Sequence, residues 1–200
     1  MTEFFSFFQH TIIKIRRFRH RNGYGVHSPF AYNLIKGVFY EKSRYYAYSE
    51  LARLRRGYKG RLAVTGRSDR LMFRLANYVR PDYVAVTGAD SGVTGEYIAA
   101  GCKKARITYC ANAGELPDER TDFCYVAPGE DFLEAYRRFA VATNEKSVFV
   151  AAGIHRTSRA AADWKTLCAD ELSIVTFDLY EVGIAFFNKK YNKQDYIVSF

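Results

Sequence analysis

The chain has 200 residues, of which 48% are hydrophobic and 26% are charged. This composition excludes a disordered or collagen-like chain and is ordinary for one globular domain. With 16 Tyr, 16 Phe and one Trp, the chain has enough large side chains for a substantial core. No stretch approaches the ~18 apolar residues of a membrane span.

The N-terminus and the cysteines bear on cellular location. An apolar stretch over residues 4–15 precedes the positive charges, the reverse of the order in a secretory signal. No pair of cysteines has the C-x-x-C spacing, so we expect reduced core thiols and neither a disulfide framework nor a zinc site. A cytoplasmic location follows as a prediction. The four cysteines are Cys102, Cys110, Cys124 and Cys168.

The net charge of +9 is unevenly distributed. Residues 1–80 hold 17 Lys or Arg and four acidic residues, whereas residues 81–200 hold 13 and 17. A basic half suits an anionic partner such as a nucleic acid or an anionic membrane surface. A solvated basic face explains the same charge without any partner, and it is the interpretation favoured here. It applies also to the basic run Lys14, Arg16, Arg17, Arg19 and Arg21.

The first 80 residues are predicted to be helical. Apolar spacing and capping residues place helices at 2–20, 28–39, 43–56 and 68–80. Ser28, Ser43 and Ser68 are the expected N-caps of the last three, because a serine hydroxyl accepts a hydrogen bond from a first-turn N–H.

From Pro81 onward, short β-branched runs alternate with helical segments. This alternation predicts a mostly parallel sheet that is covered on both faces. The last two long runs close around Tyr180-Glu181 as an antiparallel hairpin. Strands are predicted at 83–87, 106–110, 123–126, 147–151, 174–179, 182–187 and 196–200, and helices at 92–100, 130–140 and 158–167.

A glycine-containing turn, Gly88-Ala89-Asp90-Ser91-Gly92, joins the first strand to the next helix. Glycines let the backbone approach a ligand, and the helix N-terminus offers N–H groups to an anion. The same turn also serves as a tight connection without any ligand, and Asp90 suits a turn through its own backbone hydrogen bonds.

This order of elements resembles class I S-adenosylmethionine (SAM)-dependent methyltransferases, particularly the small O-methyltransferase-like ones, over nearly the whole chain. The resemblance implies an α/β, Rossmann-like methyltransferase fold in a single domain, with a helical N-terminal extension (1–80) and an α/β core (81–200). It is carried by residues 24–30, 71–78, 88–97, 147–155 and 177–187.

At the positions where that family has acidic residues, this chain has other residues. Val86 stands where the family has an acid for the methionine amino group of SAM, and Cys110 stands where a carboxylate accepts bonds from the ribose hydroxyls. Ala127 to Glu130 and Ala152-Gly153 replace two further acidic segments. The thiol of Cys110 is only a weak hydrogen-bond partner. We therefore expect residues 88–92 and Cys110 to be a vestigial SAM site.

A deletion points the same way. Only about a dozen residues separate Cys110 from Phe123, where the family has a helix, a strand and an adenine-binding loop. A helix with a strand needs at least ~10–12 residues before any turns are counted. The strand at 106–110 is therefore expected at one edge of the sheet, where Lys103, Lys104 and Arg106 would discourage edge pairing. The C-terminal hairpin is expected to form the other side of the sheet.

Four other residues are candidates for function. His27 and Ser28 lie where the family approaches the cofactor cleft, although a role in capping or bridging helices is favoured for His27. His155 follows a strand C-terminus, where α/β sheets bind ligands, but no neighbouring carboxylate completes a metal site. Glu130 is expected to serve the positive N-terminus of its helix. No catalytic residue and no metal ligand is predicted.

The sequence thus predicts a methyltransferase-like pseudoenzyme that has lost SAM binding and catalysis and acts as an interaction or scaffold protein. No cofactor is expected, and the partner would be an unknown protein or a second copy of the chain. Two alternatives stay open. One is an active SAM-dependent methyltransferase, and the other is a basic helical module that binds nucleic acid or a membrane surface.

Overall fold

The computed structural model describes residues 26–117 and 120–200. The helix expected over residues 2–20, with its basic end, lies outside the described residues. The helices are α2 (Pro29–Leu34), continued by a π-helical turn (Ile35–Phe39), α3 (Ala47–Gly57), α4 (Gly66–Val79), α5 (Gly92–Gly101), α6 (Phe132–Ala140) and α7 (Ser158–Ala169). The strands are β1 (Tyr83–Thr87), β2 (Arg106–Cys110), β3 (Phe123–Val126), β4 (Val148–Ala152), β5 (Val175–Asp178), β6 (Val182–Phe186) and β7 (Gln194–Ile197).

The described strands form one sheet in the order β2-β1-β3-β4-β6-β5-β7. Strands β2, β1, β3 and β4 are parallel, while β6 runs antiparallel to both β4 and β5. Val84 of β1 is in register with Ile107 of β2 and with Phe123 of β3. The predicted parallel sheet and its C-terminal hairpin are confirmed.

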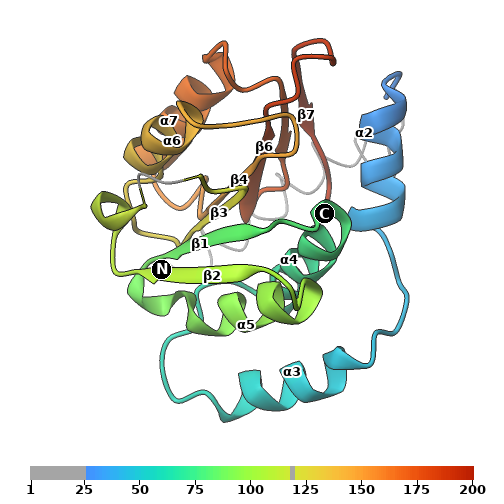
Figure 1. The fold of residues 1–200 in the computed structure, drawn as a ribbon, viewed down its shortest axis with the longest axis vertical. Helices are drawn as coiled ribbons and strands as arrows, with labels where there is room; N and C mark the ends of the chain where they lie inside the picture. Colours follow the sequence, from blue (N-terminus) through green and yellow to red (C-terminus); the bar gives the residue numbers. More distant parts are fainter. Residues whose placement is uncertain (1–25, 118–119) are drawn as a thin grey trace, which may run out of the picture.

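Helices cover both faces of the sheet (Figure 1). Val84 and Val86 of β1 pack in a core cluster with α2 and α4, whereas Ala85 between them packs in a cluster with α6 and α7. Successive side chains of a strand point to opposite faces, so both faces of β1 are buried. Helix α5 packs against α4, and α3 lies outside α5 at the bottom of Figure 1.

Strand β2 is an edge of the sheet, as predicted. Between Cys110 and Phe123 the described residues form a single 3₁₀ turn, Ala113–Glu115, and no strand. The Glu115 carboxylate accepts a hydrogen bond from the Ala111 N–H at 2.9 Å, which satisfies a backbone donor where β2 ends. The helix and strand that the resemblance implies after β2 are therefore absent from the described residues of this segment.

The opposite edge differs from the prediction. The hairpin was expected there, but β7 lies outside it and pairs in parallel with β5. Strand β7 also begins two residues earlier than predicted, because the Gln194 N–H already bonds to the Ile174 carbonyl at 2.9 Å. Strand β6 ends beside the start of β5, where Phe186 pairs with Val175, and the residues after β6 cross to the outer side of β5.

One of the three predicted serine caps is confirmed. Ser28 accepts a hydrogen bond from the Ala31 N–H at 3.4 Å. Ser43 does not cap α3, which begins at Ala47 without a side-chain cap. Ser68 does not cap α4 either, because Thr65 does so and the Ser68 hydroxyl donates to Glu181 at 2.5 Å.

A buried ion pair joins α3 to α4. Arg55 of α3 pairs with Asp69 of α4, which has no exposed surface. The Thr94 hydroxyl of α5 donates to Asp69 Oδ1 at 2.8 Å, and Arg55 also donates to the Val64 carbonyl at 2.8 Å. Burial raises the pKa of Asp69 to about 6 against the opposing effects of Thr94 and Arg55. The pair thereby fixes α3 and the segment before α4 in place.

Candidate functional site

The glycine-containing turn follows β1 as predicted. Gly88 has a φ of 101°, a conformation that favours glycine, and its N–H donates to the Cys110 carbonyl at 3.0 Å. Residues 89–91 form a 3₁₀ turn, in which Ala89 is exposed, Asp90 is half-buried and Ser91 is buried. Helix α5 then begins at Gly92. The backbone thus has the form expected of a ligand-binding turn.

Side chains from the end of β3 lie against this turn. A Cβ atom added to Gly88 would lie 2.6 Å from the Cβ of Ala127 and 3.1 Å from the Cγ of Glu130. Asp131 caps α6 by accepting from the Glu134 N–H at 3.0 Å, and Glu130 lies just before this cap. Glu130 packs on the turn, at the point where the strand order reverses between β1 and β3 and where α/β sheets bind ligands.

Cys110 ends β2 beside the same turn and is 5% exposed. Burial, with a smaller effect of Glu115, raises the pKa of its thiol, so the group stays neutral near pH 7. Val86 is fully buried within β1. Neither Val86 nor Cys110 therefore supplies a carboxylate beside Gly88.

A second candidate site lies on the same side of the sheet, at the carboxyl end of β4 and at the turn of the β5–β6 hairpin. A cavity of about 560 Å³ opens there, between these strand ends and the N-terminus of α4. Its walls include Arg67, His155, Arg156, Tyr180, Glu181 and Phe200. Of the predicted candidates, only His155 lines this cavity.

His155 is held in a defined orientation. Its Nε2 lies 2.7 Å from Asp178 Oδ2, and its ring stacks on Tyr180 with centroids 5.4 Å apart. Asp178 Oδ1 accepts a bond from the Tyr180 N–H at 2.8 Å, and Tyr180 has a φ of 74°. A non-glycine residue in this conformation is strained, and such strain gathers at functional sites. The described residues contain no cluster of three metal-ligating groups.

The carboxylate partner of His155 was missed by the sequence analysis. Asp178 lies on a different strand, 23 residues away, and only the sheet topology brings the two side chains together. The alternation of the β5 run hinted at this partner, since Asp178 is the one acidic residue in it.

Glu181 closes the N-terminus of α4. Its carboxylate accepts bonds from the Thr65 N–H at 2.8 Å, the Thr65 hydroxyl at 2.6 Å and the Ser68 hydroxyl at 2.5 Å. A carboxylate at a helix N-terminus is favoured by the helix dipole. Glu181 is therefore occupied by the protein's own donors.

The predicted cleft residues His27 and Ser28 lie away from the cavity at His155. Ser28 is the cap of α2, and the adjacent His27 is exposed. Neither residue lines the cavity at His155.

Comparison with known proteins bears on the fold. No family model matches the chain, and no curated protein matches it. Solved structures match well. The methyltransferase PaMTH1 of Podospora anserina, solved with SAH bound, is 9% identical, with a TM-score of 0.58 over 80% of this chain and 96% of that one. The O-methyltransferase TomG of Streptomyces achromogenes, solved with SAM, is 13% identical, with a TM-score of 0.52 over 77% and 95%.

An O-methyltransferase of Bacillus cereus, solved with SAH, gives a TM-score of 0.51 at 9% identity, over 77% of this chain and 96% of that one. Sequence identities this low support a shared fold and no more specific property. Together with the sheet order and the glycine turn after β1, these likenesses show that the chain has the fold of class I SAM-dependent methyltransferases.

Proposed function

We propose that this protein is a methyltransferase-like binding protein that does not use SAM and transfers no methyl group. The observation that carries the proposal is the packing of Ala127 and Glu130 against Gly88, next to a buried, neutral Cys110. SAM carries an amino group and two ribose hydroxyls. The residues at Val86 and Cys110 do not suit these groups, because neither supplies a charged acceptor.

The magnitudes support this proposal. A hydrogen bond to a charged group contributes ~1.5–3 kcal/mol, and ~1.4 kcal/mol is a tenfold change in affinity. Replacement of one ribose carboxylate by Cys110 therefore weakens SAM binding by roughly ten- to a hundredfold. The missing acid at Val86 and the short 111–122 segment act on other parts of the same ligand, so their effects largely add.

The location of the protein is a further part of the proposal. All four cysteines are free thiols in the structure. Reduced thiols are typical of the cytoplasm, where we expect the protein to act. Among the described residues, no helix combines the length and the apolar character that crossing a bilayer requires.

Isothermal titration calorimetry with SAM and with SAH tests the proposal, with TomG as a positive control. We expect no binding in the micromolar range. Micromolar binding of SAM would contradict the proposal and favour the active methyltransferase instead. The Glu130→Ala variant then locates the ligand, because loss of that binding would make Glu130 the acid that holds the amino group. Under our proposal, Cys110→Asp with Val86→Glu restores little affinity, because two side chains do not replace a missing loop.

A further inference from the structure

Two cavities of the molecule lie on either side of Arg67. The cavity at His155 and a second cavity of about 450 Å³ share Arg67 as a wall residue. The second cavity lies between the loop at 40–44, Tyr48 and the outer side of α4. We refer to the two neighbouring cavities together as the α4 groove.

Basic side chains line this groove along its length. Arg67, Arg70 and Arg74 follow one side of α4 at the spacing i, i+3 and i+7. Arg74 is used within the fold, since its guanidinium donates to the Val38 and Phe39 carbonyls. Four other cations are exposed and form no ion pair in the described part of the chain: Lys42, Arg44, Arg67 and Arg70.

The acidic residues in the walls, Glu41 and Glu181, offset only part of this charge. Glu41 accepts a hydrogen bond from the Tyr45 hydroxyl at 2.7 Å. Glu181 is occupied by three donors at the N-terminus of α4. Residues 41–74 as a whole hold ten Lys or Arg and three acidic residues. The groove is therefore a positive concavity that is suited to a polyanion.

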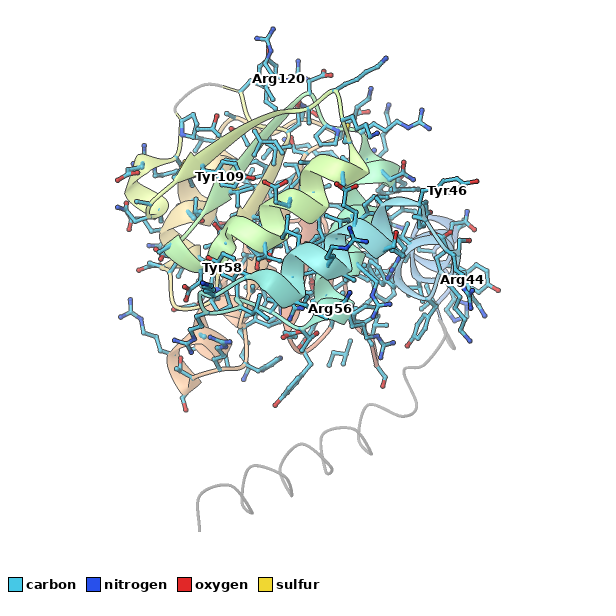
Figure 2. The ribbon with its side chains drawn as sticks, turned by 90° about the horizontal axis from the view of Figure 1, so that it is seen from below. Arg44, Tyr46, Arg56, Tyr58, Tyr109 and Arg120 are labelled. Carbon is cyan, nitrogen blue, oxygen red and sulfur yellow. The ribbon has the colours of Figure 1, made fainter. Side chains whose placement is uncertain are left out.

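One exposed aromatic ring lies near the α4 groove without lining it. Tyr46, the residue before α3, projects fully into solvent (Figure 2). Within the groove, Tyr180 stacks on His155, and the Arg67 guanidinium lies 4.2 Å above the centroid of the Phe200 ring. Exposed cations close to an exposed ring such as that of Tyr46 are features that bind single-stranded nucleic acid, because phosphates need charge and unpaired bases stack on aromatic faces.

We infer that the α4 groove binds single-stranded nucleic acid. Lys42, Arg44, Arg67 and Arg70 would contact the phosphates, and an unpaired base would stack on Tyr46. A flat bilayer does not reach the floor of a concave groove, and a duplex offers no unpaired base to this ring. The inference rests on the proposed function, for which it names the partner.

Fluorescence anisotropy with a labelled single-stranded oligouridylate of about 16 nucleotides tests the inference, since such sites span ~4–16 nucleotides. Four neutralised phosphates predict a slope near −3 for log K against log salt, at about −0.7 per phosphate. The double variant Arg67→Glu/Arg70→Glu should weaken binding at least about tenfold and make that slope shallower. Its matched control is Lys103→Glu/Lys104→Glu, which changes the net charge equally at exposed positions before β2. The control should change affinity by less than about twofold.

Several results would overturn the inference. These are no oligonucleotide binding at low salt, equal losses in the two double variants, or a duplex of the same length bound as tightly as the single strand. Binding to phosphatidylglycerol vesicles that needs Arg67 and Arg70, without binding to the oligonucleotide, would assign the groove to membranes instead. Thermal unfolding of each variant verifies its fold. The calorimetry with SAM gives its answer independently of these outcomes, so failure of either proposal is recognisable on its own.

Discussion

Replacing Arg55 by methionine should destabilise the protein in a pH-dependent way. Arg55→Met removes the guanidinium that pairs with Asp69 but keeps a side chain of similar length. Asp69 is fully buried, so at neutral pH the variant must either hold a buried carboxylate without its cation or take up a proton at a cost in free energy. Breaking a buried pair in this way costs about 3–5 kcal/mol in the free energy of unfolding.

Protonation of Asp69 removes most of that cost at acidic pH. The pKa of Asp69 is about 6 in the folded protein, above its ordinary value of 3.8, so the folded state binds the proton more tightly than the unfolded state does. The stability from this proton is complete below about pH 4 and is lost as the pH rises through about 6. Arg55 lowers the pKa, so the variant keeps the proton to a higher pH still. At pH 5 the carboxyl is mostly neutral in both proteins, and the loss falls to about 1 kcal/mol for the bond to the Val64 carbonyl.

Urea unfolding at pH 5 and at pH 7.5 measures this difference. The control is Arg56→Met, because Arg56 is the next residue of α3 and its side chain is exposed. The control should change stability by less than about 0.5 kcal/mol at either pH. An equal loss in Arg55→Met at both pH values would refute the reasoning, since it would show that Asp69 does not titrate in this range.

Two further substitutions test the packing of the helices. Gly101→Ala should destabilise the protein by more than about 2 kcal/mol, because its Cβ would overlap the Phe73 carbonyl oxygen where α5 meets α4. Gly57→Ala, which meets nothing within 4 Å, is the control in the same urea titration, and similar losses in both would contradict this account. Arg80→Gly should raise the melting temperature by roughly 2–4 °C, since Arg80 ends α4 with a φ of 52° and glycine adopts that conformation without strain. A lower melting temperature would show that the Arg80 side chain stabilises the fold more than its backbone strains it.

The sheet was largely predictable from the sequence, and the reason lies in the strands themselves. β1, β2 and β3 are apolar or β-branched runs between turn residues, and their observed bounds equal the predicted ones. The missing strand was also predictable, because a segment as short as 111–122 cannot hold a helix and a strand. The start of α4 was not, because Thr65 and Ser68 are both suitable caps and both bond to Glu181, whereas only the Thr65 hydroxyl accepts from a first-turn N–H of α4.

Only those parts of the candidate sites that lie within one short segment of the chain were predictable from the sequence. The turn at 88–92 was recognised from its glycines, whereas the packing of Glu130 on Gly88 depends on how β3 and β1 lie side by side. The partnership of His155 with Asp178 and the row of arginines beside the 40–44 loop come from residues far apart in the chain. Local patterns do not encode such meetings, because the topology of the sheet produces them.

Because the chain is synthesised from its N-terminus, some contacts of this fold can form only when synthesis is nearly complete. Helices α2 and α4 are synthesised first, yet they pack on strands that are synthesised last. Phe30 of α2 packs edge-on against Phe186 at 5.1 Å, and the Tyr40 hydroxyl donates to the Ser199 carbonyl. Contacts between such distant residues form slowly, and the apolar surfaces that await them invite aggregation. On the ribosome, the apolar side of these helices must therefore stay exposed until the C-terminal strands emerge.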